Sequence, residues 1–401
     1  MHILMIAPEP FFEPRGTPFS EYHRIRALTG LGHTVDLVTY PFGREVEIPG
    51  LRIFRSLRPP GVGSVRVGPS WAKVALDMAL VLTALRRVVS TRYDVVHSHE
   101  EGAAIGLALA ACTRSPHLYD MHSSLPQQLE NFAFSRSRFL RWVFTRLERS
   151  AIRRSRVTIV ICPYLAEHVR AIDPRAAVVL IENAPGSGAV PTPGAGLAVR
   201  ERLGLEPRTP LVLYTGTFEA YQGLDLLLEA MRVVVAGRPE ARLVLAGGKP
   251  TQVSAFRRLA DARGVGPTVV FAGERPAEEI PDFLDAADVL VSPRSTGTNT
   301  PLKIYQYLRS GRPIVATRLL THTQVLDDSV AELVEATPEA FGRGILSLLG
   351  DPVRARALAA AARQLAETRY SDAAYIEKTR ESYALIAGDG APVRSAPGGG
   401  R

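Results

Sequence analysis

Cysteine is scarce in this sequence: Cys112 and Cys162 are the only two among 401 residues, and they form no CxxC pair. A disulfide framework and a cysteine zinc site are therefore not expected, and a reducing compartment is favoured. Lysine is scarce as well, because only four of the 48 basic residues are lysine. The formal net charge of +8 thus reflects a broad use of arginine. Without an RNP, zinc-finger or homeodomain signature, this charge does not indicate nucleic-acid binding.

Long apolar runs and a leader are also lacking. The N-terminal MHILMIAPEPFFEP has no basic n-region, and its apolar run is too short for a signal peptide. The most apolar helical pattern, residues 74–85, carries Asp77 and is too short to span a bilayer. These features predict a cytoplasmic protein, and they leave open a peripheral contact with the inner face of the membrane.

Several catalytic motifs are missing. The chain contains no GxxxxGK[ST], no GxGxxG after a strand, no HExxH, no Asp-x-Asp and no GxSxG. P-loop hydrolysis and ordinary dinucleotide binding therefore lose support. His97 and His99 form an HxH at a predicted strand end. Metal binding there is one interpretation, and a polar strand terminus near a cleft is the favoured one. We expect no metal and no resident cofactor.

Short β-branched runs alternate with helical patterns along the whole chain. This alternation of near-continuous apolar strands with helices predicts parallel sheets covered on both faces. The fold class we expect is α/β, with two doubly wound Rossmann-like domains that face each other across a cleft. The predicted strands are 2–8, 34–40, 51–56, 93–99, 116–122, 158–163, 178–183, 211–217, 242–248, 268–273, 287–293 and 313–317.

Composition predicts the domain boundaries. The stretch NAPGSGAVPTPGAG has the Gly, Pro and Ala content of a linker, and the C-terminal end is Gly/Pro-rich like a disordered segment. We predict an N-terminal domain over 1–183, a linker over 184–200, a C-terminal domain over 201–370, a terminal helix over 371–387 and a disordered tail over 388–401.

Polar residues gather at predicted strand ends, where ligands of such sheets bind. After the first strand, a loop carries Arg15, Gly16 and Thr17 before a helix that we expect to begin near Ser20. Gly16 would let the backbone approach a ligand closely. His122 lies just past another strand, where both a structural and a functional role are open.

The stretch TGTNTPLKIYQYLRSGRPIVAT, residues 296–317, is typical of an anion site. Thr300 is a candidate helix cap, Pro301 suits the first helical position and Gly311 would end the helix. The N-terminus of a helix offers free N–H groups and a positive dipole end to an anion. Lys303, within the first turn, would add its positive charge.

In combination, these motifs resemble the family-4 retaining glycosyltransferases of the GT-B fold, over residues 1–385. The matching stretches are GHTVDLVT (32–39), YDVVHSH (93–99), GLDLLLEAM (223–231), ADVLVSP (287–293) and PLKIYQYLRSGRPIVAT (301–317). The resemblance implies a nucleotide-sugar donor, expected to be UDP-linked, on the C-terminal domain and the acceptor on the N-terminal domain. It also implies front-face substitution without metal, in which the leaving phosphate helps to deprotonate the acceptor hydroxyl. Polysaccharide biosynthesis is the implied setting.

The resemblance also implies roles for individual residues. The β-phosphate would meet the backbone N–H groups of Leu302 and Lys303. Lys303 and His122 are the candidate catalytic residues. The acceptor-side candidates are Arg15, His99 and Glu100, with solvated carboxylates an equal reading for Glu100. The full set of candidate donor contacts is Gly16, Thr17, Gly216, Thr217, Gln222, Gly223, Arg294, Thr298, Asn299, Thr300, Leu302 and Gln306.

This chain departs from the family pattern at four of these positions. Thr298 and Gln306 stand where the family commonly has glutamates, and Thr217 and Gln222 stand where it commonly has basic residues. Arg294 and Lys303 are candidate substitutes for the missing positive charge. The departures keep two alternatives open: a GT-B protein that has lost transfer and only binds, and a nucleotide-sugar epimerase.

The acceptor is not identified by any motif. Residues 134–156 carry eight arginines and one glutamate, with apolar residues at helical spacing. Such a basic amphipathic helix is typical of an anionic membrane surface. An ordinary domain helix with solvated arginines is the alternative. A glycan, a lipid-linked sugar and a small molecule all remain candidate acceptors.

Overall fold

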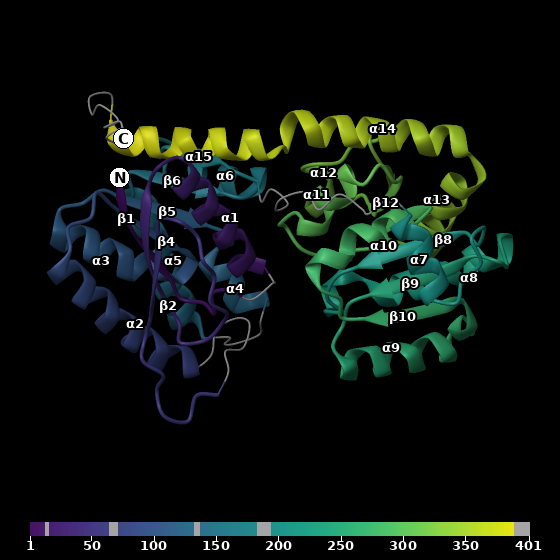
Figure 1. Cartoon of the computed structure of the whole chain (residues 1–401), viewed down its shortest axis with the longest axis horizontal. Coiled ribbons are helices and arrows are strands. Elements are labelled where there is room, and N and C mark those ends of the chain that lie inside the picture. The colour runs from purple at the N-terminus through teal and green to yellow at the C-terminus, as the bar shows by residue number, and fades with distance from the viewer. Residues whose placement is uncertain (13–15, 64–70, 132–136, 183–193, 389–401) are drawn as a thin grey trace, which may run out of the picture. The chain divides into compact units, whose positions relative to one another are not determined.

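The computed structural model describes residues 1–12, 16–63, 71–131, 137–182 and 194–388, which form two compact α/β units (Figure 1). Unit 1 comprises Met1–Ala184 and the segment from Ala373 onward, and unit 2 comprises Pro185–Asp372. Helix α7 begins at Ala195, inside the predicted linker. Residues 389–401 of the predicted tail lie outside the described part of the chain.

Unit 1 is built on a seven-stranded parallel sheet with the order β3-β2-β1-β4-β5-β6-β7. The order reverses between β1 and β4, so the carboxyl ends of these two strands form the switch point where such sheets bind ligands. The strands are β1 (His2–Ala7), β2 (Thr34–Thr39), β3 (Leu51–Arg55), β4 (Val95–His99), β5 (His117–Met121), β6 (Val157–Val160) and β7 (Val178–Leu180).

Both faces of this sheet are covered, because successive side chains of a strand point to opposite faces. Ile3 and Met5 of β1 pack with the face that carries α1 and α15, whereas Leu4 and Ile6 pack with α2 and α3. The helices of unit 1 are α1 (Gly16–Gly30), α2 (Trp71–Ser90), α3 (Ala103–Thr113), α4 (Leu125–Asn131), α5 (Arg138–Arg154), α6 (Pro163–Ile172) and α15 (Asp372–Ala387). Helix α1 therefore begins at Gly16, earlier than the predicted start near Ser20.

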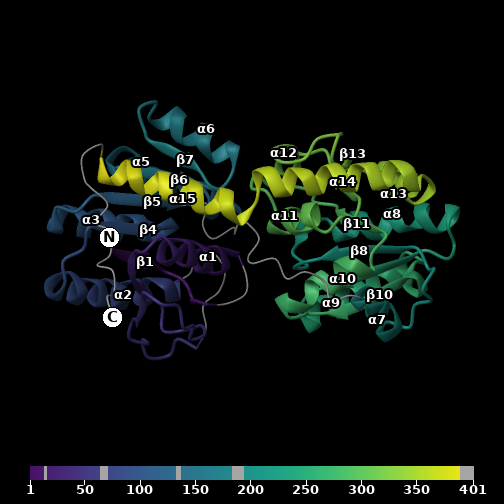
Figure 2. The same cartoon turned by 45° about the horizontal axis from the view of Figure 1, so that its top comes forward.

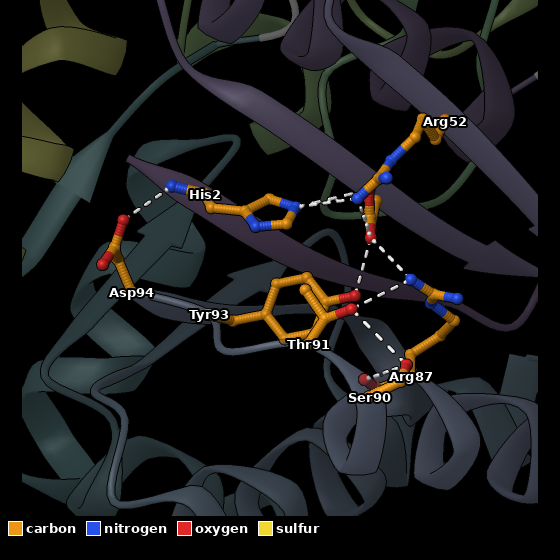
Figure 3. A network of polar contacts seen from close by, with 8 residues as sticks. His2, Arg52, Arg87, Ser90, Thr91, Tyr93 and Asp94 are labelled. Atoms are coloured by element: carbon orange, nitrogen blue, oxygen red, sulfur yellow. Dashed lines mark hydrogen bonds and ion pairs between the residues drawn. The ribbon is translucent and has the colours of Figure 1, made fainter.

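A network of polar contacts that includes Arg52, Arg87 and Tyr93 links the amino ends of the unit 1 strands (Figure 3). Asp36 of β2 accepts hydrogen bonds from Arg52 (2.7 and 2.8 Å) and from the Tyr93 hydroxyl (2.6 Å). Arg87 of α2 lies 3.6 Å from the same carboxylate, and its guanidinium stacks on Phe54. Burial alone would raise the pKa of Asp36, but these hydrogen bonds outweigh it and lower the pKa. The inner side of α2 is thereby fixed to the sheet.

Unit 2 repeats the architecture with a six-stranded parallel sheet in the order β10-β9-β8-β11-β12-β13. Its switch point lies between β8 and β11. The strands are β8 (Leu211–Thr215), β9 (Arg242–Ala246), β10 (Val269–Gly273), β11 (Val289–Ser292), β12 (Ile314–Thr317) and β13 (Glu332–Val334). The helices are α7 (Ala195–Arg202), α8 (Leu224–Gly237), α9 (Pro250–Ala262), α10 (Ile280–Ala286), α11 (Leu302–Arg309), α12 (Leu320–Thr323), α13 (Pro338–Gly350) and α14 (Pro352–Arg369).

The last helix, α15, belongs to the core of unit 1 and lies along its sheet (Figure 2). Tyr375, Tyr383 and Ile386 join the apolar cluster under α1. Within the described residues, no helix combines the length and the apolar character that a membrane crossing requires.

Candidate functional site

The loops that follow β8 and β11 approach each other closely at the switch point of unit 2. Gly223 has φ +71°, and a Cβ at this position would lie 2.0 Å from the carbonyl oxygen of Pro293, which follows β11. Gly216 has φ +132°, and its Cβ would lie 3.1 Å from Lys303 Nζ. Glycine is required at Gly223 because a Cβ would strike the Pro293 carbonyl, and it is favoured at Gly216 because other residues rarely adopt this φ.

Gly223→Ala is expected to destabilise unit 2 by at least about 2 kcal/mol more than Gly264→Ala. The two glycines share a left-handed φ, +71° and +72°, but Gly264 has open space around its Cβ position. Both variants carry the same conformational penalty, so their difference isolates the clash with Pro293. Urea unfolding of both variants measures it. Equal midpoints would show that the two loops do not depend on this contact.

The helix of the predicted anion site begins later than its sequence indicates. Helix α11 starts at Leu302, and Pro301 is its N-cap residue with ψ 134° and no side-chain cap. The prediction that Thr300 caps and Pro301 opens the helix is therefore wrong. Thr300 is buried instead, and its Oγ1 makes no hydrogen bond within the described residues. Gly311, with φ +69°, follows the helix as predicted.

Lys303 projects from the first turn of α11 toward β8 and the loop that follows it. It is 8% exposed, its Nζ donates to Gln222 Oε1 (3.2 Å), and it lies 3.7 Å from the centre of the Tyr214 ring. Burial, and then the nearby charge of Arg294, hold the pKa of Lys303 well below its usual value. Among the residues that the structure describes, no carboxylate forms an ion pair with this ammonium group.

Arg294, just after β11, is the second cation of the site. Its Nη1 donates to the backbone oxygen of Asn299 (2.5 Å) and to Thr321 Oγ1 (2.7 Å). The guanidinium lies 4.9 Å from the centre of the Tyr221 ring. Burial lowers the pKa of Arg294 as well. Two cations thus share a low-dielectric site at the N-terminus of a helix, an arrangement that favours an anion between them.

Among the other predicted donor contacts of unit 2, Thr217 follows β8, whereas Thr298, Leu302 and Gln306 lie near these cations along the chain. Thr217 is exposed, and its backbone oxygen accepts from the Tyr214 hydroxyl (2.6 Å). The backbone oxygen of Thr298 accepts from Gln324 Nε2 (2.6 Å). Leu302 and Gln306 are half-buried on α11. The structure thus brings Gln222 to Lys303 and Asn299 to Arg294, while in the described part of the chain Gln306 forms no hydrogen bond with either cation.

In unit 1, the carboxyl ends of β4 and β5 form a buried polar cluster centred on Asp120. Its carboxylate lies 3.2 Å from His122 Nε2 and 3.4 Å from His97 Nε2, and it accepts a hydrogen bond from Arg24 Nε (3.1 Å). Burial would raise the pKa of Asp120, but the charge of Arg24 and then of His122 hold it well below its usual value. Conversely, burial would lower the pKa of His122, and Asp120 raises it.

His97, His99 and Asp120 are placed so that together they could hold a metal ion, with ligand atoms within 4.8 Å of one another. However, the guanidinium of Arg24 already contacts Asp120 Oδ2, the oxygen nearest both histidines. A divalent ion there would face a fixed positive charge. The residues therefore fit an ion-paired strand terminus better than a metal centre.

The acceptor-side predictions fall in the same part of unit 1. His99 is 1% exposed, and its ring centre lies 5.6 Å from that of His122. Glu100 follows β4 and accepts from Ser123 Oγ (3.2 Å). Gly16 and Thr17, which were predicted as donor contacts, open α1 in the same unit. Arg15 lies outside the described residues.

The sequence analysis did not single out Asp120 or Arg24, although the pattern that places Asp120 near the histidines is visible in the sequence. Asp120 and His122 alternate as D-x-H, and His97 and His99 alternate as H-x-H, so each pair shares one face of its strand. The pairing of His99 with Asp120 across β4 and β5 then brings the two motifs together. Arg24 comes from α1 and has no comparable pattern. Its Nη1 also donates to Thr379 of α15 (2.9 Å).

Two parallel sheets with polar strand ends at their switch points define a two-domain protein of the GT-B class. The model of the group 1 glycosyl transferases matches residues 209–351, and that of the glycosyl transferase 4-like domain matches residues 22–184. The chain therefore belongs to the family-4 glycosyltransferases of the GT-B fold, as its motifs predicted.

Individual relatives agree with this assignment. A GDP-mannose-dependent α-(1-6)-phosphatidylinositol monomannoside mannosyltransferase of Mycolicibacterium smegmatis is 33% identical over 184 residues, which is 44% of this chain and 48% of that protein. The chain thus spans about half the length of this curated relative. Among solved structures, sucrose-phosphate synthase from Thermosynechococcus elongatus superposes with a TM-score of 0.77 at 19% identity, covering 96% of this chain and 98% of that one. The HepE protein of Anabaena, solved with UDP, gives 0.74 at 16% identity, covering 96% and 100%.

Proposed function

We propose that the protein transfers a hexosyl group from a nucleotide-sugar donor to a hydroxyl acceptor, with retention at the anomeric carbon and without a metal ion. The observation that carries this proposal is a pair of cations, the buried Lys303 and the half-buried Arg294. Burial of a charge is costly unless an opposite charge is present, and a diphosphate supplies that charge. The relative from M. smegmatis is named for GDP-mannose and HepE was solved with UDP, so nucleoside diphosphates suit this family.

The same cations support a chemical role. When the bond between the anomeric carbon and the β-phosphate oxygen breaks, negative charge develops on the leaving diphosphate. Lys303, Arg294 and the N-terminus of α11 stabilise that charge, which is the task that a metal performs in other enzymes. The acceptor oxygen forms its bond to the same face of the anomeric carbon, and its proton passes to the leaving phosphate. Bond formation on the face from which the phosphate leaves retains the configuration of the anomeric carbon.

Further roles are proposed for polar residues at the strand ends of unit 1. His122 is the candidate for contact with the donor sugar, and Glu100 and His99 are the candidates for acceptor hydroxyls. We expect the donor to be a UDP-sugar, and a GDP-sugar is the next candidate. The acceptor class is a glycan, a lipid-linked sugar or a small molecule.

The test is donor binding and slow donor hydrolysis across UDP-, GDP-, ADP- and dTDP-sugars, in EDTA. We expect one donor to bind and to release its nucleoside diphosphate slowly. Binding without turnover, also after a panel of hydroxyl acceptors is added, would favour the inactive binding protein. A changed sugar nucleotide without acceptor would favour the epimerase. No binding by any donor would overturn the assignment of Lys303 and Arg294 to a diphosphate.

A further inference from the structure

The helices α2, α3 and α5 form a contiguous outer layer on one face of the unit 1 sheet. Helix α2 contacts α3, and α3 contacts α5. Figures 1 and 2 both show α2 and α3 side by side. The opposite face of the same sheet carries α1 and α15. The outer side of this three-helix layer carries exposed apolar residues and arginines.

Helix α2 is apolar on both sides. Leu76, Leu80 and Ala84 are fully buried against the sheet. A helix at a protein surface normally presents polar residues on its other side. Here the outward side carries a continuous stripe of large apolar residues, each between 42% and 86% exposed: Val74, Met78, Leu82, Leu85 and Val89. Such a stripe indicates a binding surface.

Helix α5 continues this surface with aromatic side chains. Phe139 and Trp142 are 68% and 57% exposed, and their rings stack with centres 6.0 Å apart. The guanidinium of Arg146 lies 5.7 Å from the Trp142 ring. Between α2 and α5, the exposed positions of α3 are small and apolar: Ala104, Ala108, Ala111 and Cys112.

The charge of this layer has one sign. Asp77 and Glu148 are the only acidic residues on the three helices, and neither is exposed outward. Asp77 accepts from the Tyr40 hydroxyl (2.5 Å), and Glu148 is 1% exposed. The exposed charged residues on the described part of the layer are all arginines: Arg86, Arg138, Arg141, Arg146, Arg149, Arg153 and Arg154.

We propose that this layer, α2 with α3 and α5, docks unit 1 on an anionic lipid bilayer. The apolar stripe and the two aromatic rings enter the boundary between headgroups and acyl chains, and the arginines contact lipid phosphates. Tryptophan prefers this interfacial depth, and arginine binds phosphate bidentately. A second copy of the chain fits less well, because pairing two such layers would bring two sets of arginines together.

This surface goes beyond the proposed function and does not require it, because none of its residues belongs to the candidate site. Because it would hold the protein at the bilayer, this surface would favour acceptors that are lipid-linked or lie at the membrane surface. The sequence alone did not decide whether residues 134–156 form a helix that binds a membrane surface or an ordinary domain helix with solvated arginines. The exposed stripe of α2, which the sequence did not reveal, favours the membrane.

The test is flotation of the full chain with vesicles of phosphatidylcholine alone and of phosphatidylcholine with 30% phosphatidylglycerol, at low and high salt. We expect binding to the anionic vesicles, weakened by salt, and little binding to the neutral ones. The variant Met78→Ser/Leu82→Ser removes exposed side chains only, so its fold and its nucleotide binding should be unchanged. Its partition onto anionic vesicles should fall at least about tenfold.

The matched control is Ile376→Ser/Leu385→Ser, which removes two exposed apolar residues from α15 on the opposite face (41% and 43% exposed). It should bind vesicles like the wild type. The proposal is overturned if the wild type ignores anionic vesicles, or if both double variants bind equally well. It is also overturned if light scattering shows a dimer that Met78→Ser/Leu82→Ser converts to a monomer, because a second copy then covers the stripe.

Discussion

Lys303→Met is expected to lower kcat/KM for the donor by about 10²–10³-fold while leaving the melting temperature unchanged or higher. Loss of one preorganised group that stabilises developing negative charge typically costs this much in rate. The free energy of unfolding should stay the same or rise. The ammonium group is buried without a carboxylate partner among the described residues, and burial and then Arg294 lower its pKa. Methionine fills similar space against Tyr214 without a buried charge.

The control for this variant is Arg343→Met on α13. Arg343 is an exposed cation of the same unit, so its replacement makes the same change in net charge. We expect its donor kinetics and its melting temperature to equal those of the wild type. Equal kinetics for Lys303→Met and Arg343→Met would remove Lys303 from the donor site.

Proton uptake gives a second measurement of the same interaction. In the free protein the pKa of Lys303 is lowered, and a bound diphosphate would raise it. Between these two pKa values, binding therefore takes up a proton, and affinity falls as the pH rises. Calorimetric titration of the nucleoside diphosphate in buffers of low and high ionisation enthalpy measures this uptake. Lys303→Met should abolish it.

The fold was predictable because its signals are local. Each buried parallel strand is a short apolar run, and the loops after β8 and β11 carry their glycines in the sequence. The start of α11 was predicted wrongly from the helix-end preferences of Thr300 and Pro301, since Thr300 is buried and Pro301 is extended at the N-cap position. The placement of α15 in unit 1 depends on contacts such as Arg24 with Thr379, which lie 355 residues apart. No local pattern reports such a contact.

In the candidate site, too, the residues in local motifs were predictable from the sequence, whereas the contacts between distant segments were not. Lys303, Arg294 and the glycines belong to recognisable stretches, so the anion site of unit 2 was predictable. Which polar group meets which cation was not, because Gln222 and Lys303 come from different loops and meet only in three dimensions. In unit 1, His122 was singled out from its strand end. Asp120, which raises the pKa of His122, lies two residues earlier in the chain, but its contacts with His97 and His99 required the pairing of β4 with β5.

Asp120→Asn is expected to destabilise unit 1 by about 3–5 kcal/mol, because it leaves Arg24 buried without its counter-charge. Arg24 is 1% exposed and Asp120 is fully buried, so water cannot replace the lost partner. The melting temperature should fall by about 10 °C. Asp120 has a lowered pKa, so its contribution is present above about pH 4 and is lost as the pH falls through the folded value. Thermal unfolding at pH 7 and at lower pH measures both effects.

The same variant should change the titration of His122. Asp120 raises the pKa of His122, and this contribution to stability is present below about pH 6.5 and is lost as the pH rises through the raised value. In Asp120→Asn the pKa of His122 should fall. If protonated His122 serves turnover, the upper limb of the pH profile of kcat then moves to lower pH.

Asp36→Asn separates this effect from a general loss of stability. Asp36 is also a buried carboxylate of unit 1 with an arginine partner, but it lies at the amino ends of the strands, away from His122. Both variants should lose stability, because each removes the charge that its arginine contacts. Only Asp120→Asn should shift the pH profile of the folded enzyme. An equal shift in both variants, or in neither, would show that the Asp120 cluster supports the fold of unit 1 and does not set the protonation of His122.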